Sequence, residues 1–161
     1  DRSRHRARCD ARRSDSEGER PEIVTPDELA RASAAAMWST DTASRGLGME
    51  ILEVAPGRAT LTMTLGDGML NGHEIAHGGF IFTLADSAFA FACNSYGERT
   101  VAQHCTISFI RPVNRGARLV ATAREVSRVG RSGIYDVSVS ADGTVVAEFR
   151  GFSRTVGGSI V

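Results

Sequence analysis

A long apolar stretch between Phe80 and Tyr96 constrains the fold more than any other part of this chain. It contains neither proline nor glycine and follows the Gly78-Gly79 pair, which predicts a helix of several turns. Apolar side chains cover every side of its helical wheel, so we expect a helix that is buried all round and wrapped by the rest of the domain. A chain of 161 residues is long enough to build one such core, and a second domain is not expected.

Asp86 is the only charged residue in this stretch. Burying a carboxylate in an apolar helix costs free energy unless a partner or a chemical role compensates for it, and carboxylates with perturbed pKa values are concentrated at active sites. Asp86 is therefore the first candidate catalytic residue. The alternative interpretation is a structural acid that is hydrogen-bonded to neighbouring backbone.

The segments on either side of the helix show the alternation of apolar and polar residues that is typical of strands. Residues 47–54 and 58–65, separated by the Pro56-Gly57 turn, predict a hairpin. After the helix we expect a run of four strands at 100–111, 117–129, 134–140 and 144–155. This order predicts an α+β fold in which a single antiparallel sheet curls around one long central helix.

A shorter helix is expected before the hairpin. Thr25-Pro26-Asp27-Glu28 has Thr at the N-cap, Pro at the first helical position and Glu three residues after the cap, which is the pattern of a capping box. The helix should extend to about Trp38.

Composition argues against several classes of protein. Residues 1–20 contain seven arginines and five acidic residues with almost no large apolar side chains, so we expect a disordered tail before a single domain at 21–161. The chain has no net charge, which gives little support to nucleic-acid binding. Asp86 interrupts the longest apolar run, so no membrane span is expected, and the arginine-rich start lacks the apolar stretch of a secretory signal. We expect a cytoplasmic protein with reduced cysteines at Cys9, Cys93 and Cys105.

The Gly78-Gly79 entry to the central helix is a second chemical feature. The first N–H groups of a helix have no intrahelical acceptor and the helix dipole favours negative charge there, so unshielded glycines offer donors to a developing oxyanion. Close packing of the helix on a strand is the alternative reason for glycine. His77 directly precedes the pair, where it can cap the helix or position a substrate. Asn71 belongs to an Asn-Gly turn, which by itself accounts for an asparagine at this position.

Three motifs resemble the PaaI-type hotdog thioesterases of phenylacetate degradation: Asn71-Gly72-His73, His77-Gly78-Gly79 and the helical segment LADSAFAFACNS at 84–95. Phe109-Ile110-Arg111-Pro112 and Tyr135-Asp136 also fit that family, and the similarity covers roughly residues 46–158.

This resemblance implies a hotdog fold, tetramers built from dimers, and hydrolysis of acyl-coenzyme A thioesters, notably phenylacetyl and ring-hydroxylated phenylacetyl esters. It implies that Asp86 is the catalytic carboxylate and that Gly78 is the backbone donor that polarises the thioester carbonyl. Asn71 and His77 are then polar residues lining the same site. No cofactor is expected, because coenzyme A is part of the substrate.

Two further roles are less defined by the sequence. Many hotdog thioesterases hold water with a Ser or Thr early in the strand after the central helix, but Ala102 stands at the equivalent position here, which leaves Gln103 and Thr106 as candidates. Three arginines are candidates for contacts with the phosphates of coenzyme A, the alternative being ordinary solvated side chains: Arg128, Arg131 and Arg150.

The segment from His73 to His77 matches the HExxH pattern of zinc proteases. That site requires both histidines one turn apart on a helix, whereas the flanking Asn-Gly and Gly-Gly pairs predict a loop. We therefore expect no metal, although His104 is an imaginable third ligand. The chain has no GxSxG motif, which disfavours a serine hydrolase of the α/β type. Cys93 has no histidine near it in sequence and is interpreted as a small buried side chain.

The leading functional hypothesis is an acyl-coenzyme A thioesterase in which Asp86 acts as nucleophile or general base, two roles that the sequence does not separate. One alternative is a hotdog enoyl-coenzyme A hydratase or dehydratase that uses His77 with Asp86. The other is a non-catalytic acyl-coenzyme A binding module, against which the presence of Asp86 argues.

Helix geometry adds an expectation about assembly. At about 1.5 Å per residue, Gly78 and Asp86 of one chain are separated by roughly 12 Å along the axis, whereas an attacking group must come within about 3.5 Å of the carbonyl. If Gly78 is the donor, Asp86 must come from another chain. An isologous dimer with antiparallel helices meets this requirement and places two active sites at the dimer interface.

Overall fold

The computed structural model describes residues 24–161, and the arginine-rich segment at 1–20 lies outside the described residues. The helices are α1 (Pro26–Thr40), α2 (Thr42–Gly46) and α3 (Gly78–Cys93), with a 3-10 turn at Asp67–Met69. The strands are β1 (Glu50–Ala55), β2 (Arg58–Thr64), β3 (Glu98–Phe109), β4 (Arg118–Val129), β5 (Ser132–Ala141) and β6 (Thr144–Ser159). Each predicted helix and strand is present, and the five-residue helix α2 is an addition to the prediction.

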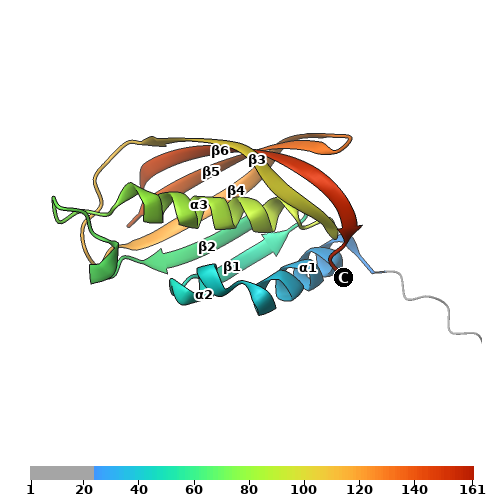
Figure 1. The fold of residues 1–161 in the computed structure, drawn as a ribbon, viewed down its shortest axis with the longest axis horizontal. Coiled ribbons are helices and arrows are strands. Elements are labelled where there is room, and N and C mark those ends of the chain that lie inside the picture. The colour runs from blue at the N-terminus through green and yellow to red at the C-terminus, as the bar shows by residue number, and fades with distance from the viewer. Residues whose placement is uncertain (1–23) are drawn as a thin grey trace, which may run out of the picture.

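All six strands form one antiparallel sheet in the order β1-β2-β4-β5-β6-β3. Figure 1 shows this sheet curving around α3, which confirms the predicted α+β arrangement. The four strands expected after the helix are present, but they do not all pair in chain order, because β3 pairs with β6 and not with β4. The 16-residue strand β6 is bordered by β5 on one side and β3 on the other, so β3 forms the far edge of the sheet.

The inner face of the sheet packs on α3 through small and branched side chains. Residues 119, 121 and 123 of β4 and residues 135, 137 and 139 of β5 alternate inward and are at most 1% exposed. Gly151 of β6 lies against the Phe89 ring, where an added Cβ would come within 2.8 Å of three ring carbons. Close approach of helix and sheet therefore requires glycine at this position.

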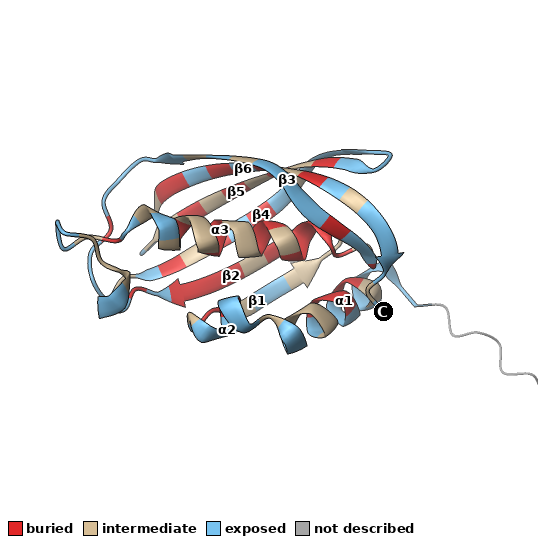
Figure 2. Ribbon diagram, in the orientation of Figure 1, coloured by how far each residue is buried: buried red, intermediate tan, exposed pale blue. Residues whose placement is uncertain are grey.

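The prediction that α3 is buried all round is wrong for one stripe of the helix. Phe82, Thr83, Asp86, Ser87 and Ala90 are only partly buried, and Figure 2 shows such residues in tan along α3. Within the stripe, Phe82 packs edge-to-face on Phe149 of β6 and Ser87 contacts Ser44 of α2. The strands of one chain therefore cover this side of the helix only in part.

Both ends of the sheet-and-helix unit are fixed by side-chain hydrogen bonds. Beyond the C-terminal end of α3, the Glu125 carboxylate accepts hydrogen bonds from the Tyr96 hydroxyl at 2.7 Å and the Tyr135 hydroxyl at 3.0 Å. At the start of α1, Thr25 and Glu28 form the predicted capping box. Helix α1 packs beside β1 and covers that edge of the sheet (Figure 1). Within residues 24–161, no helix is long and apolar enough to cross a membrane.

Candidate active site

His77 is the N-cap residue of α3. Its Nδ1 atom accepts a hydrogen bond from the N–H of Gly79 at 3.0 Å, and its backbone carbonyl accepts one from the N–H of Phe80 at 3.0 Å. Because Nδ1 is an acceptor, the neutral ring carries its proton on Nε2. The cap therefore leaves His77 with one N–H donor on the opposite side of its ring.

Gly78 is the first residue of α3. Its N–H donates no hydrogen bond to any atom of residues 24–161, as expected for the first N–H group of a helix. The partial positive charge of the helix dipole is also concentrated here. An unpaired donor at this end can stabilise an oxyanion, which is the chemistry that the sequence predicted for Gly78.

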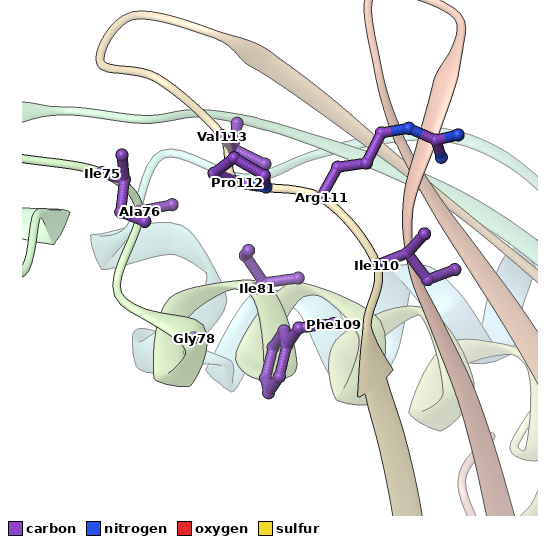
Figure 3. A pocket seen from close by; sticks show the side chains of 9 residues that line it. All are labelled: Ile75, Ala76, Gly78, Ile81, Phe109, Ile110, Arg111, Pro112 and Val113. Carbon is purple, nitrogen blue, oxygen red and sulfur yellow. The ribbon is translucent and has the colours of Figure 1, made fainter.

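An apolar cavity of about 480 Å³ opens beside Gly78. Its lining comes from the loop before α3, the first turn of α3 and the segment after β3, as Figure 3 shows: Ile75, Ala76, Gly78, Ile81, Phe109, Ile110, Arg111, Pro112 and Val113. A cavity of this size is within the usual range of small-molecule sites.

Asn71 begins the loop that leads to His77. Its Oδ1 atom accepts hydrogen bonds from the N–H groups of His73 at 2.9 Å and Ile75 at 3.4 Å, so the side-chain carbonyl folds this loop. The Asn71 amide NH₂ group donates to nothing in the described part of the chain. Asn71 therefore stabilises the turn through its Oδ1 atom, as the Asn-Gly pattern suggested, and its NH₂ group is still free to donate a hydrogen bond.

The HExxH segment adopts a loop. Ile75 and Ala76 form isolated β-bridges with Asn114 and Leu70, and the two histidines at its ends are not arranged on one helical face, which zinc proteases require. The N–H of His77 donates to the carbonyl of Met69 at 2.8 Å. These backbone contacts fix the direction in which the chain enters α3.

Asp86 lies in the middle of α3 on the partly open stripe. Burial raises the pKa of its carboxyl above the ordinary value, and no hydrogen bond opposes this shift. A structural acid satisfied by neighbouring backbone is therefore not what the structure shows. Cys105 of β3 is close enough for the Asp86 charge to raise the pKa of its thiol, although burial is the larger cause. The Asp86 carboxylate is therefore partly buried and close to β3.

Gly78 and Asp86 are not brought together within one chain. Both belong to α3, and eight residues of helix separate them by roughly 12 Å along the axis. The cavity lining includes Gly78 but not Asp86. Within one chain the candidate donor and the candidate carboxylate therefore lie at separate places on α3.

A hydrogen-bonded chain next to Asp86 was not anticipated from the sequence. The Ser44 hydroxyl donates to Asp41 Oδ2 at 2.7 Å, and Ser44 Oγ lies 2.9 Å from Ser87 Oγ. Asp41 is the N-cap of α2, and the short Asp-x-x-Ser capping pattern was the available signal. This network attaches α2 to the middle of α3.

The two candidates for holding water, Gln103 and Thr106, do not face α3. Thr106 pairs with Arg150 on the outer face of the sheet, whereas Cys105 pairs with Gly151 on the inner face. Gln103 is displaced at a bulge between Ala102 and His104. The alternation of a strand reverses across a bulge, which the sequence pattern alone did not reveal.

The three candidate phosphate-binding arginines are engaged in contacts within the chain. Arg150 makes a bidentate pair with Asp136 at 2.6 and 2.9 Å, which raises the Arg150 pKa and lowers the Asp136 pKa. Arg128 stacks on the Tyr96 ring at 3.5 Å, and Arg131 Nε donates to the carbonyl of Thr155 at 3.0 Å. They do not form a cluster beside Gly78.

Comparison with known proteins identifies the class to which this architecture belongs. The thioesterase superfamily model matches residues 73–148, from the loop before α3 into β6. The chain is a member of the thioesterase superfamily. Over 129 residues it is 45% identical to acyl-coenzyme A thioesterase PaaI of Escherichia coli K12, covering 80% of this chain and 92% of that protein.

Solved structures agree with this assignment. The structure of E. coli PaaI superposes with a TM-score of 0.82 at 42% identity, covering 84% of this chain and 99% of that one. A mutant of the phenylacetic acid degradation protein PaaI from Thermus thermophilus gives 0.70 at 40% identity, covering 72% and 100%. A Streptococcus mutans protein bound to acetyl CoA gives 0.67 at 25% identity, covering 69% and 90%. The predicted hotdog fold and thioester hydrolase class are confirmed.

Proposed function

We propose that this protein hydrolyses arylacetyl thioesters of coenzyme A, namely phenylacetyl and hydroxyphenylacetyl esters, to the free acid and coenzyme A. The observation that carries the proposal is the unpaired Gly78 N–H, which lies at the start of α3 and borders an apolar cavity. The similarity to PaaI proteins at 40 to 45% identity supports the choice of substrate class.

In the proposed reaction the Gly78 N–H donates to the thioester carbonyl oxygen and stabilises the negative charge that develops there. The Nε2–H of His77 and the amide of Asn71, neither of which belongs to the cavity lining, are the further donors of this proposal at the same end of α3. The partner subunit's Asp86 either attacks the carbonyl carbon or removes a proton from an attacking water. Collapse of the tetrahedral intermediate then releases the coenzyme A thiolate. No cofactor or metal takes part.

Two features of the surface support a dimer that shares its sites. Edge strand β3 is 12 residues long and mostly exposed, and no described segment covers its free backbone groups in the way that α1 covers β1. Such an edge pairs readily with another strand. A two-fold axis at this edge also covers the open stripe of each α3. We propose a dimer of this kind, paired into a tetramer in the cytoplasm, with no role in nucleic-acid or membrane binding.

The candidate phosphate contacts remain a prediction within this proposal. Arg128 and Arg131 keep free guanidinium N–H groups near the C-terminal end of α3, which antiparallel packing directs towards the partner subunit's Gly78. Arg150 is the weakest of the three candidates, because its charge is already matched by Asp136.

Release of free thiol from phenylacetyl-coenzyme A tests the function directly. We expect turnover of this ester and no hydration of crotonyl-coenzyme A under the same conditions. Hydration without thiol release would instead identify a hydratase. Tight binding of several acyl esters with no turnover would identify a binding module.

A single turnover in oxygen-18 water distinguishes the two roles of Asp86. If Asp86 attacks directly, water cleaves a mixed anhydride and the first label is expected in the enzyme's carboxylate. If Asp86 is a general base, all label is expected in the product acid. Mass spectrometry of the peptide that contains Asp86 measures the difference.

A further inference from the structure

We propose that the cavity beside Gly78 binds the acyl group of the thioester and not the pantetheine arm of coenzyme A, and that Phe109 gives this cavity its preference for an aromatic acyl group. This assignment rests on the proposed hydrolase function and specifies which part of the substrate enters the cavity.

Position is the first argument. Gly78, the proposed carbonyl donor, is itself part of the cavity wall. A carbonyl held by the Gly78 N–H has one substituent on either side, the acyl group and the sulfur of coenzyme A. One of these two groups must therefore enter the cavity.

Polarity decides between the two groups. Most backbone donors of the wall are already used: the N–H of Ala76 donates to Val113, and the N–H groups of Ile110 and Arg111 donate to Val146, while Pro112 has none. The N–H groups of Gly78 and Val113 donate to no atom of residues 24–161, and the first of these is the proposed donor to the thioester carbonyl. Figure 3 shows the Arg111 side chain directed away from the cavity, and its Nη1 atom donates to the carbonyl of residue 145 at 2.7 Å.

A pantetheine arm contains two amide groups, and burying an amide without a hydrogen-bond partner costs roughly 1–3 kcal/mol. An apolar acyl group entering the same space loses no hydrogen bonds and gains the free energy of burying its surface. The wall therefore fits the acyl side of the thioester.

Phe109 provides the aromatic surface of this wall. Its ring lies directly over Gly78, since an added Cβ at position 78 would be 2.8 Å from the ring Cζ atom. The residue is 53% exposed, so part of the ring remains available for contact with a ligand. Edge-to-face or offset contact between aromatic rings contributes about 0.5–1.5 kcal/mol beyond burial alone, which an aliphatic acyl chain cannot obtain.

The test compares kcat/KM for phenylacetyl-coenzyme A and hexanoyl-coenzyme A in the wild type, in Phe109→Leu and in a matched control. Leu keeps an apolar side chain but removes the ring, so the preference for the phenylacetyl ester should fall by about fivefold. Phe152→Leu is the control, because Phe152 packs at a tilt against His104 and does not line the cavity, and it should leave the ratio unchanged. Melting temperatures verify that all three proteins are folded.

A second variant, Ile75→Trp, reduces the space in the cavity. We expect kcat/KM for phenylacetyl-coenzyme A to fall at least about tenfold more than kcat/KM for acetyl-coenzyme A, and inhibition by free coenzyme A to change less than either. A melting temperature close to that of the wild type verifies that the variant is folded. Equal losses for both esters together with weaker inhibition by coenzyme A would place the pantetheine arm in the cavity and overturn the assignment.

Different results would contradict the proposed hydrolase function and the assignment of the cavity. A folded wild-type protein that hydrolyses no thioester contradicts the proposed function itself. Hydrolysis by the wild type with an unchanged substrate ratio in Phe109→Leu contradicts only the role of Phe109 and its cavity.

Discussion

Replacing Asp86 with Asn is expected to lower kcat for phenylacetyl-coenzyme A by at least about 100-fold, the usual contribution of a positioned acid or base. Asn keeps the shape of the side chain but has no anionic oxygen to attack the carbonyl or accept a proton from water. A steady-state thiol-release assay measures the loss. Activity near the wild-type level would show that the carboxylate is dispensable and that the proposed chemistry is wrong.

The same substitution should not destabilise the fold. Burial raises the pKa of Asp86, so the folded state binds this proton more tightly than the unfolded state does. The contribution of Asp86 to stability is then fully present below the unfolded pKa and is lost as pH rises through the folded pKa. At neutral pH the Asn variant should therefore melt no lower than the wild type, and any gain should shrink as pH falls.

Asp136→Asn is the matched control for this experiment. The Arg150 guanidinium lowers the pKa of Asp136, so this carboxylate stabilises the fold above its unfolded pKa and less as pH falls through the folded pKa. Asp136→Asn should therefore lower the melting temperature at neutral pH and retain turnover. Opposite outcomes for the two aspartates would separate a catalytic carboxylate from a structural one.

Local signals in the sequence predicted local structure well. The capping box at Thr25, the His77-Gly78 entry to α3 and the length of the central helix each depend on neighbours within a few residues. The five-residue helix α2 was not predicted, because a single cap and one turn leave little periodicity to detect. The predicted start of α3 places the Gly78 N–H, the candidate donor to the thioester carbonyl.

Contacts between distant segments were not predictable in the same way. Hydrophobic periodicity reports that a face of α3 is covered, but it does not distinguish cover by the chain's own sheet from cover by a second molecule. The place of β3 beside β6 depends on how the chain crosses the sheet after Phe109. For the same reason, Phe109 is part of a family motif in the sequence but has no role predictable from it, although its ring lies on Gly78.

The second large effect is expected when two inactive variants are mixed. In a shared-site dimer, each site takes Gly78 and His77 from one subunit and Asp86 from the other. His77→Ala removes the Nε2–H donor and the cap on Gly79, at a cost of about 1 kcal/mol in stability, and should be poorly active. Asp86→Asn is inactive for the reason given above.

A heterodimer of these two variants contains one site with both defects and one site with neither. Random exchange of equal amounts makes about half of the dimers heterodimeric, so activity should return to about a quarter of the wild-type level. Mixing Asp86→Asn with the Asp86→Asn/His77→Ala double variant is the control, since no combination of those chains builds an intact site. Native mass spectrometry measures exchange, and thiol release measures activity.

Gly78 and Asp86 are roughly 12 Å apart along one helix. Recovered activity therefore requires that Gly78 of one subunit and Asp86 of the other meet across a two-fold axis. If heterodimers form and the mixture remains as inactive as its parents, each chain must build its own site. Gly78 then cannot be the donor to the carbonyl on which Asp86 acts, because no side chain of that length spans two helical turns. The oxyanion would then need a donor within reach of Asp86 in the same chain. The proposed binding of the acyl group in the cavity beside Gly78 would also be wrong.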